Sequence, residues 1–507
     1  MDMELKKNTY NFYEKALWQS FSCEVMRENI VPDSCADIAR IIDTTGYVCV
    51  ISREFTGDGR ICASGCVHVS VLYIPEKGDG PCALRFQIPF QSCSEGQGAG
   101  ECEFPDVCGE LRSIDTRLLN PRKVLTRADL SFSPSGCLKR SLSPAFEAAQ
   151  GDDTLQLMQK KQEIRTVVGV SEKEFSFSEE MPVSPGRQGI EEILSVRSSV
   201  RGADCKLIGS KLVVKGLLSA VILYRDSESQ VALQQQEIPF SQILEGSGLR
   251  EDDEFEAVFR TLSMECRIGT ETSPNDPHMI SLSAMLRTRV TAYRRENVLY
   301  IADLYSTALQ TNCQRMDLEL TEESHTVSRR LAVRELLETG TSVRQVIDTR
   351  LRCGMLRISG EEMEAPVWVQ CLYLDENEVL RSVGKEFTVS GSVDLPAMVQ
   401  AAGDSCLQGD LLCAVQPDGI EVRFTLDCRI EYARRGRHSC VCAVETEEAD
   451  AQAGRPSLVL RKFSRDESLW SVAKQYRTTC RAILSVNGLE GEEAIPLDRL
   501  LLIPTAR

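Results

Sequence analysis

The sequence predicts a mainly β protein: three tandem antiparallel β-sandwich or barrel-like repeats, followed by a small βααβ domain. Three observations predict this architecture. Short motifs recur about 150 residues apart, apolar and polar residues alternate inside each repeat, and the last stretch of about 50 residues carries apolar side chains at helical spacing. Strict alternation places the apolar set on one face of a strand, whereas a helix needs apolar residues three or four positions apart.

A Leu-Tyr pair marks each repeat. The tyrosines lie 151 and 149 residues apart, and an Ile-Pro-Phe motif begins at Ile88 and Ile238, with Phe387 in the matching place of the third repeat. A unit this long can bury a core of its own, so the period indicates tandem domains rather than a solenoid of short units. The Leu-Tyr pairs are Leu72-Tyr73, Leu223-Tyr224 and Leu372-Tyr373. We place the repeats at residues 1–150, 165–300 and 315–445.

Alternation is clearest in the third repeat, where apolar residues occupy every second position from Ile420 to Tyr432. Residues 280–292 show the same pattern in the second repeat, and residues 124–132 show it more weakly in the first. Residues 211–224 are largely β-branched and apolar, as in a strand that is buried on both faces. Each repeat is therefore predicted to be an antiparallel β domain.

Three segments connect the predicted domains. Residues 141–167 join the first two repeats and include a stretch, residues 152–164, that we expect to form a short helix. Residues 297–326 join the second and third repeats. Residues 446–456 are acidic, rich in small residues and without periodicity, which is typical of a flexible linker.

The C-terminal segment, residues 457–507, is a different module. Residues 458–460 predict a short strand, and Asp466 is placed to cap a helix with Leu469 on its apolar face, because a carboxylate can accept a hydrogen bond from the first turn. A second helix is expected from residue 479 to residue 486, ended by the Asn487-Gly488 pair. Residues 500–503 complete the βααβ order as a strand.

These residues resemble the LysM domain. The matching positions are residues 467–473, Tyr476, residues 483–487 and residues 501–504. The resemblance implies binding of N-acetylglucosamine-containing glycans in a groove between residues 465–469 and residues 487–496. The candidate groove residues are Asp466, Glu467, Ser468, Leu469, Asn487, Gly488 and Leu489. Asp466 stands where the family has a glycine, which places a side chain and a charge where backbone usually approaches the sugar.

Charge is distributed unevenly along the chain. The whole chain has 58 Lys and Arg against 75 Asp and Glu, a net charge of −17, which argues against a general nucleic-acid binder. The C-terminal segment, in contrast, has eight basic and six acidic residues. Lys474, Arg477 and Arg481 could form a basic helix face for an acidic protein partner, or simply a solvated helix surface.

The three repeats resemble the SPOCS domain of spore-coat proteins from endospore-forming Firmicutes. The resemblance lies in residues 190–194, 69–73, 220–224, 236–240 and 119–123, and the third repeat departs from it most. SPOCS repeats followed by one LysM domain form the architecture of SipL-type coat morphogenetic proteins. The resemblance implies a structural protein that acts from the mother-cell cytoplasm at the forespore surface and in the spore coat. It also implies that LysM docks on the morphogenetic ATPase of the basement layer or on other coat proteins.

Location bears on the choice between protein and glycan as the LysM ligand. The N-terminal residues have no apolar signal-peptide core, and no run of 18 apolar residues could span a membrane. Peptidoglycan lies outside the cytoplasmic membrane, so a LysM domain kept in the cytosol needs another ligand, or one reached only after engulfment. We expect a non-enzymatic assembly protein; the alternative is a protein that binds peptidoglycan, cortex glycan or N-acetylglucosamine oligomers.

The sequence offers little for catalysis or metal binding. The 21 cysteines are expected to be mostly buried thiols, although later cross-linking stays open, and the Cys62 and Cys66 pair lacks the second pair that zinc needs. Cys66 and His68 could form a nucleophilic pair, but residues two apart on a strand are about 7 Å apart at Cα, a poor start for a hydrogen bond. We expect no catalytic residue, no metal and no cofactor.

Overall fold

The computed structural model describes residues 2–78, 80–149, 154–184, 188–270, 273, 275–321, 325–396, 399–448, 456–464, 467–491, 495 and 500–505. Strands account for 76 % of it and helices for 4 %. The mainly β fold class, with a small helical domain at the C-terminus, is therefore confirmed.

The first β unit is a sandwich of two antiparallel sheets. One face comes from β6 and β7 and the other from β9, whose alternate side chains meet in one core that includes Val69, Ile88 and Phe132. One sheet contains β5 (Ile38–Phe55), β6 (Arg60–Pro75) and β7 (Cys82–Glu95). The facing strands are β4 (Phe21–Ile30), β8 (Cys102–Asn120) and β9 (Lys123–Leu142), and a 3-10 turn, η1 (Ala99–Glu101), precedes β8.

The second β unit repeats this plan. Leu218, Ile222 and Tyr224 on one sheet pack against Leu282 and Leu286 on the other. The first sheet contains β12 (Ile190–Ile208), β13 (Lys211–Asp226) and β14 (Val231–Glu245). The facing strands are β11 (Leu155–Pro182), β15 (Glu254–Ile268) and β16 (Met279–Ser306).

The third β unit has the same two layers. The alternating residues of the sequence pattern, from Ile420 to Ile430, are buried in its core together with Val369 and Tyr373 of the facing sheet. One sheet contains β19 (Val343–Cys353), β20 (Arg357–Ser359), β21 (Glu362–Asp375) and β22 (Leu380–Ser392). The facing strands are β18 (His325–Glu338), β23 (Val399–Gln416) and β24 (Gly419–Glu448).

The Leu-Tyr pairs explain how the three β units meet. Neighbouring side chains on a strand point to opposite faces. Each tyrosine is buried in the core of its own unit, whereas the leucines meet in one apolar cluster shared by all three units, here called the leucine junction. The buried members of the leucine junction are Ile42, Leu72, Leu194, Leu223, Leu372 and Leu380. Each Leu-Tyr pair therefore supplies one side chain to the core of its own unit and one to the contact between the units.

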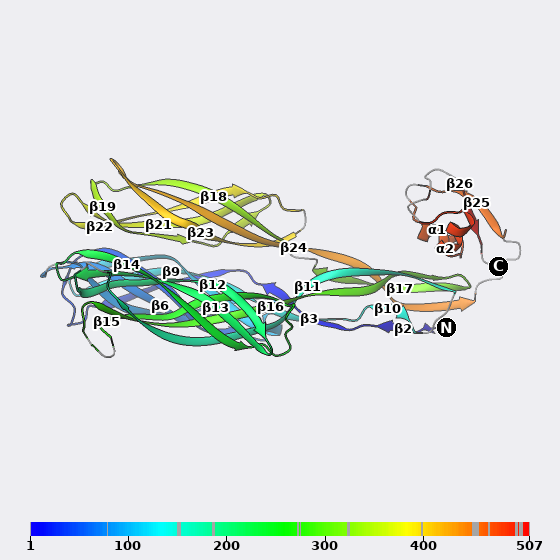
Figure 1. Ribbon diagram of the computed structural model, residues 1–507, viewed down its shortest axis with the longest axis horizontal. Coiled ribbons are helices and arrows are strands. Elements are labelled where there is room, and N and C mark those ends of the chain that lie inside the picture. The colour runs from blue at the N-terminus through cyan, green and yellow to red at the C-terminus, as the bar shows by residue number, and fades with distance from the viewer. Residues whose placement is uncertain are drawn as a thin grey trace.

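Paired strands continue beyond the β units as a stalk, visible in Figure 1. In the stalk, β11 pairs with β16 and β24 pairs with β17 (Leu309–Thr321). Short N-terminal and connecting strands complete it: β1 (Asp2–Met3), β2 (Leu5–Lys7), β3 (Tyr10–Leu17) and β10 (Ala145–Ala148). Two apolar clusters hold it together, one around Ile164, Val298 and Leu318 and one around Ile301 and Val444.

The expected helix at residues 152–164 is wrong. From Leu155 onward this segment is a strand, and residues 151–153 lie outside the described residues. Its Gln, Lys, Met and Leu residues have good helix propensity, but propensity is a weak preference that tertiary pairing overrides. Here Leu155 and Leu157 gain burial against Ile301 and Val444 only when the segment pairs with β16. Of residues 297–326, where a linker was expected, residues 297–306 and 309–321 likewise belong to strands of the stalk, and residues 322–324 lie outside the described residues.

The C-terminal domain has the expected βααβ order. It consists of β25 (Leu458–Lys462), α1 (Leu469–Gln475), α2 (Cys480–Val486) and β26 (Leu500–Pro504), with β25 and β26 paired. Figure 1 shows it beside the stalk, at the end of the molecule away from the three β units. Of the predicted acidic linker, residues 446–448 belong to β24 and residues 449–455 lie outside the described residues.

Candidate functional site

The ends of the two helices in the C-terminal domain fix its loops. Helix α1 is capped by Ser468, whose Oγ accepts a hydrogen bond from the backbone N–H of Ser471 at 3.1 Å. The expected cap, Asp466, lies outside the described residues. Thr479 caps α2 in the same way, and Gly488 follows α2 with a φ of 67°, a left-handed conformation that favours glycine.

Half of the candidate groove residues that the structure describes are engaged inside the domain. Leu469 is 1 % exposed and belongs to the core. The Asn487 side chain donates to the carbonyls of Ile483 and Leu502 and accepts from the Leu502 N–H, which ties α2 to β26. Glu467 forms an ion pair with Arg461. These three residues therefore support the fold of the domain.

The other three described groove residues remain at least partly accessible. Ser468 and Gly488 are exposed and Leu489 is half-buried at the edge of the core. They come from the two loops that the LysM resemblance assigned to the groove. A ligand in this groove would thus meet one hydroxyl, one backbone segment and one apolar edge among the candidates that the structure describes.

The predicted docking face is divided as well. Lys474 Nζ donates to both carboxylate oxygens of Asp303 on β16, at 2.7 and 2.8 Å, so it contacts the stalk. Arg481 is exposed on α2. Arg477 is half-buried and follows α1 with a φ of 53°. Of the three predicted basic residues, Arg481 is the one most open to an external partner.

Asp303 and Tyr305 on β16 join the C-terminal domain to the stalk. Trp470 Nε1 also donates to Asp303, at 2.8 Å, and Tyr305 donates to the Thr478 carbonyl at 2.7 Å. Burial raises the pKa of Asp303, but the hydrogen bonds from Lys474 and Trp470 outweigh it and hold this pKa below its ordinary value of 3.8. We call the contacts of Asp303 and Tyr305 with this domain the seat.

Sequence reasoning missed the seat. Asp303 and Tyr305 lie in residues 297–326, which were interpreted as a connection between repeats. Tyr305 is 3 % exposed, packs in the core of the C-terminal domain and lies 4.8 Å from the Trp470 ring in a T-shaped arrangement. In the sequence, Tyr305 is one of several apolar residues of this segment, and nothing in the pattern indicates its partner.

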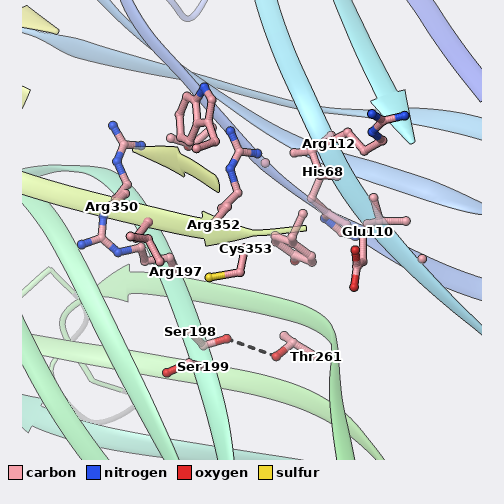
Figure 2. A pocket seen from close by; sticks show the side chains of 18 of the residues that line it. His68, Glu110, Arg112, Arg197, Ser198, Ser199, Thr261, Arg350, Arg352 and Cys353 are labelled. Carbon is pink, nitrogen blue, oxygen red and sulfur yellow. Dashed lines mark hydrogen bonds between the residues drawn. The ribbon is translucent and has the colours of Figure 1, made fainter. Parts of the chain in front are cut away.

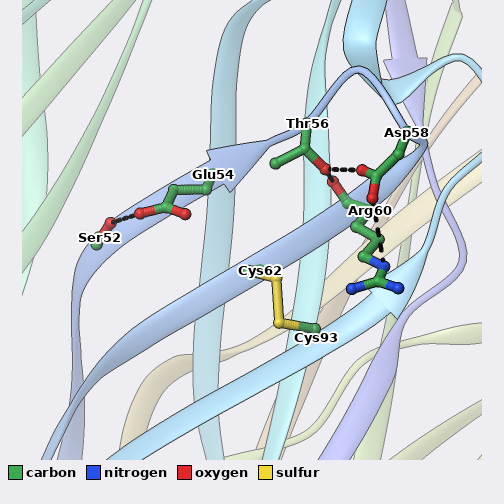
Figure 3. Close-up of a disulfide and its surroundings, with 7 residues drawn as sticks. All are labelled: Ser52, Glu54, Thr56, Asp58, Arg60, Cys62 and Cys93. Atoms are coloured by element: carbon green, nitrogen blue, oxygen red, sulfur yellow. Dashed lines mark hydrogen bonds and ion pairs between the residues drawn. A yellow bond between two sulfur atoms is a disulfide. The ribbon is translucent and has the colours of Figure 1, made fainter.

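Two cysteine contacts involve strand β6. Cys62 is joined to Cys93 by a disulfide between the directly paired strands β6 and β7, so it is not a free thiol (Figure 3). Cys66 Sγ lies 3.4 Å from His68 Nε2, so the two side chains come together on one strand face although their spacing along the strand made a hydrogen bond a poor prospect. Burial raises the pKa of Cys66 and lowers the pKa of His68, which disfavours a thiolate–imidazolium pair.

The described ranges contain no group of three or more His, Cys, Asp or Glu residues arranged to hold a metal ion. They also contain no helix that is long and apolar enough to cross a bilayer.

Comparison with protein families matches two parts of the chain. Residues 189–268, which include β12 to β15, match the SPOCS domain of SipL, and residues 464–504 match the LysM domain. No match was found among the curated proteins or among the solved structures. Both matched domains are of non-catalytic binding or structural types.

The fold and these matches define a class: a sporulation-related, spore-associated protein that carries a module of the peptidoglycan-binding type. Within this class the chain is a SipL-like protein with a C-terminal LysM domain. The match to the SPOCS domain falls in the second β unit, so the assignment of the first and third repeats to the same domain stays a prediction.

Proposed function

We propose that the chain is a non-enzymatic assembly protein of the spore coat, which docks the coat on the forespore surface through protein–protein contacts. Its LysM domain is the docking module, and its partner is the basement-layer morphogenetic ATPase or another coat protein. It acts from the mother-cell cytoplasm. The three β units supply the second set of contacts.

The observation that carries this proposal is the separation of the two recognition ends. The LysM domain and the β units lie at opposite ends of the stalk (Figure 1), and the seat fixes the LysM domain to the stalk through Lys474, Trp470 and Asp303. A protein that bridges two layers benefits from a fixed spacing, because ordering the bridge in advance reduces the entropy lost on binding. A tethered glycan-binding module gains less from such a seat.

The alternative function is binding of peptidoglycan or cortex glycan. The match to the LysM family supports it, and Ser468, Gly488 and Leu489 remain accessible for a sugar. The two functions differ in how they depend on charge. Reversing a charge on α2 weakens a salt-sensitive protein complex and changes glycan affinity little.

The test uses the purified full chain with the purified ATPase on a biosensor and, separately, with insoluble peptidoglycan in a sedimentation assay. We expect ATPase binding that Arg481→Glu weakens and that added salt weakens further. Arg330→Glu, an equal change of charge at an exposed residue on β18, is the matched control. Saturable retention on peptidoglycan without ATPase binding would contradict the docking proposal and establish the alternative.

A further inference from the structure

A large cavity lies where the three β units meet. Its volume is about 1800 Å³, and its wall includes strands from all three units: β5 to β8, β12, β13 and β15, and β19, β21 and β23. It adjoins the leucine junction, since Thr45, Ser195 and Thr349 in its wall each follow a residue of that cluster by one to three positions. Ordinary ligand pockets measure about 300–1000 Å³, so this cavity has room for a ligand with several charged groups.

The wall is strongly basic. Nine arginines and three glutamates line the cavity, in a chain whose net charge is −17, so the wall does not reflect the composition of the chain. Figure 2 shows Arg197, Arg350 and Arg352 gathered on one side, with His68, Glu110 and Arg112 across from them. Low-dielectric walls of one sign concentrate field lines and attract ions of the opposite sign.

Four of the nine arginines have acidic partners, and three of these pairs join different β units. Arg197 of the second unit pairs with Asp348 of the third, and Arg350 of the third pairs with Asp43 of the first. Arg260 of the second unit binds Asp106 of the first through both carboxylate oxygens, at 2.6 and 2.8 Å. These arginines hold the wall together, and Arg267 pairs locally with Glu265.

The other five arginines have no ion pair within the described part of the chain. Arg352 stacks over the Trp368 ring at 3.9 Å, and burial together with the charge of Arg350 lowers its pKa to about 10. Burial also lowers the pKa of Arg85, whose guanidinium donates to the Ile193 carbonyl. A lowered arginine pKa means that burial and like charge disfavour the cation more than the nearby carboxylates stabilise it. The five are Arg85, Arg112, Arg201, Arg352 and Arg357.

Neutral donors surround these cations. Eight serines and three threonines line the cavity, among them Ser198, Ser199 and Thr261 (Figure 2). Ser198 and Thr261 already share a hydrogen bond of 3.1 Å. Planar guanidinium groups bind phosphate and carboxylate through two parallel hydrogen bonds, and hydroxyls can donate to the remaining oxygens.

We propose that this cavity is a binding site for a small, multiply charged anion that presents phosphate or carboxylate groups, held by Arg352 and Arg201 from two different β units. This site is separate from the LysM domain and independent of the docking function. A ligand here supplies the missing counter-charge and bridges the second and third units.

Binding is measured by isothermal titration calorimetry on the full chain at low salt, with inorganic triphosphate and citrate as probes. We expect at least one probe to bind with a Kd below about 1 mM. Arg352→Gln and Arg201→Gln should each weaken binding about tenfold or more, because each removes a charge-assisted hydrogen bond. Arg330→Gln on β18, outside the cavity, should leave binding unchanged. The preferred probe tells phosphate from carboxylate.

Three outcomes would overturn the proposal: neither probe binds the unchanged chain, the cavity variants bind as well as the control, or hexaglutamate binds while both small anions fail. The last result would identify an acidic peptide as the ligand. Arg352→Gln also alters the contact with Trp368, so thermal unfolding must show that it is folded. If the Arg352→Gln variant is not folded, the test rests on Arg201→Gln, because the Arg201 side chain is exposed.

Discussion

Replacing Tyr305 should release the LysM domain from the stalk. The ring of Tyr305 is 3 % exposed, packs in the LysM core against Trp470, and its hydroxyl donates to Thr478. Truncating a buried aromatic residue to alanine costs about 3–5 kcal/mol. If the loss falls on the contact between LysM and stalk, Tyr305→Ala shifts the equilibrium between seated and released LysM by a factor between about 10² and several times 10³.

Amide relaxation by NMR on a perdeuterated chain measures this release, because a seated LysM domain tumbles with the whole molecule and a released one tumbles faster. Tyr305→Phe is the matched control: it loses one hydrogen bond, worth about 1 kcal/mol, and should stay seated. LysM amides in Tyr305→Ala that still tumble at the rate of the whole chain would refute the reasoning. Loss of the LysM resonances' dispersion would instead show that Tyr305 is needed for the domain to fold.

Three further predictions concern charge and covalent bonds. Asp303 has a lowered pKa in the seated state, so its carboxylate stabilises seating above about pH 4. This contribution is lost as the pH falls below the ordinary pKa of 3.8, and the same relaxation experiment across pH 3–6 measures the loss. Replacing Cys62 and Cys93 with serine should lower the free energy of unfolding by about 3–4 kcal/mol, since the disulfide closes a loop of 31 residues; urea titration measures it, and an unchanged midpoint would contradict it. Asp43→Asn leaves the buried Arg350 with Asp348 alone, 3.5 Å from its Nε, and should cost about 3 kcal/mol, the low end of the range for breaking a buried ion pair, seen as a lower melting temperature; an unchanged melting temperature would show that the Asp43 pair is dispensable.

The sequence was informative where one pattern has one structural solution. The alternating residues of β24 are buried on one face because a period of two fits only a strand. The Leu-Tyr pairs were recognised as a repeat, yet the sequence could not show that the leucines contact one another across units. In the LysM domain, the two helices follow from local apolar spacing, whereas the caps, Ser468 and Thr479, were not predicted.

The rest could not be predicted because it depends on which distant segments meet. Residues 155–164 have helix-forming composition, and only pairing with β16 makes them a strand. Asp303 reaches Lys474 and Trp470 from 171 and 167 residues away, a distance at which sequence carries no contact signal without further information. The arginines of the cavity are scattered over strands of all three units, so their convergence appears only when the units close around the leucine junction.

The three β units are not joined equally. The first and second units share one continuous sheet, because β3 pairs with both β9 and β11. Their contact also includes a network in which Arg53 binds Asp106 and Glu172. The long strands of the third unit, β18, β23 and β24, belong to another sheet, so this unit meets the other two through side chains. Those side chains include the leucine junction and the ion pairs of Asp43 and Asp348, both beside the arginine cavity, and the pairs of Glu431 with Lys15 and Arg165. An anion that binds the wall arginines of the third unit and of the second together would therefore strengthen a contact between two units whose facing strands lie in different sheets.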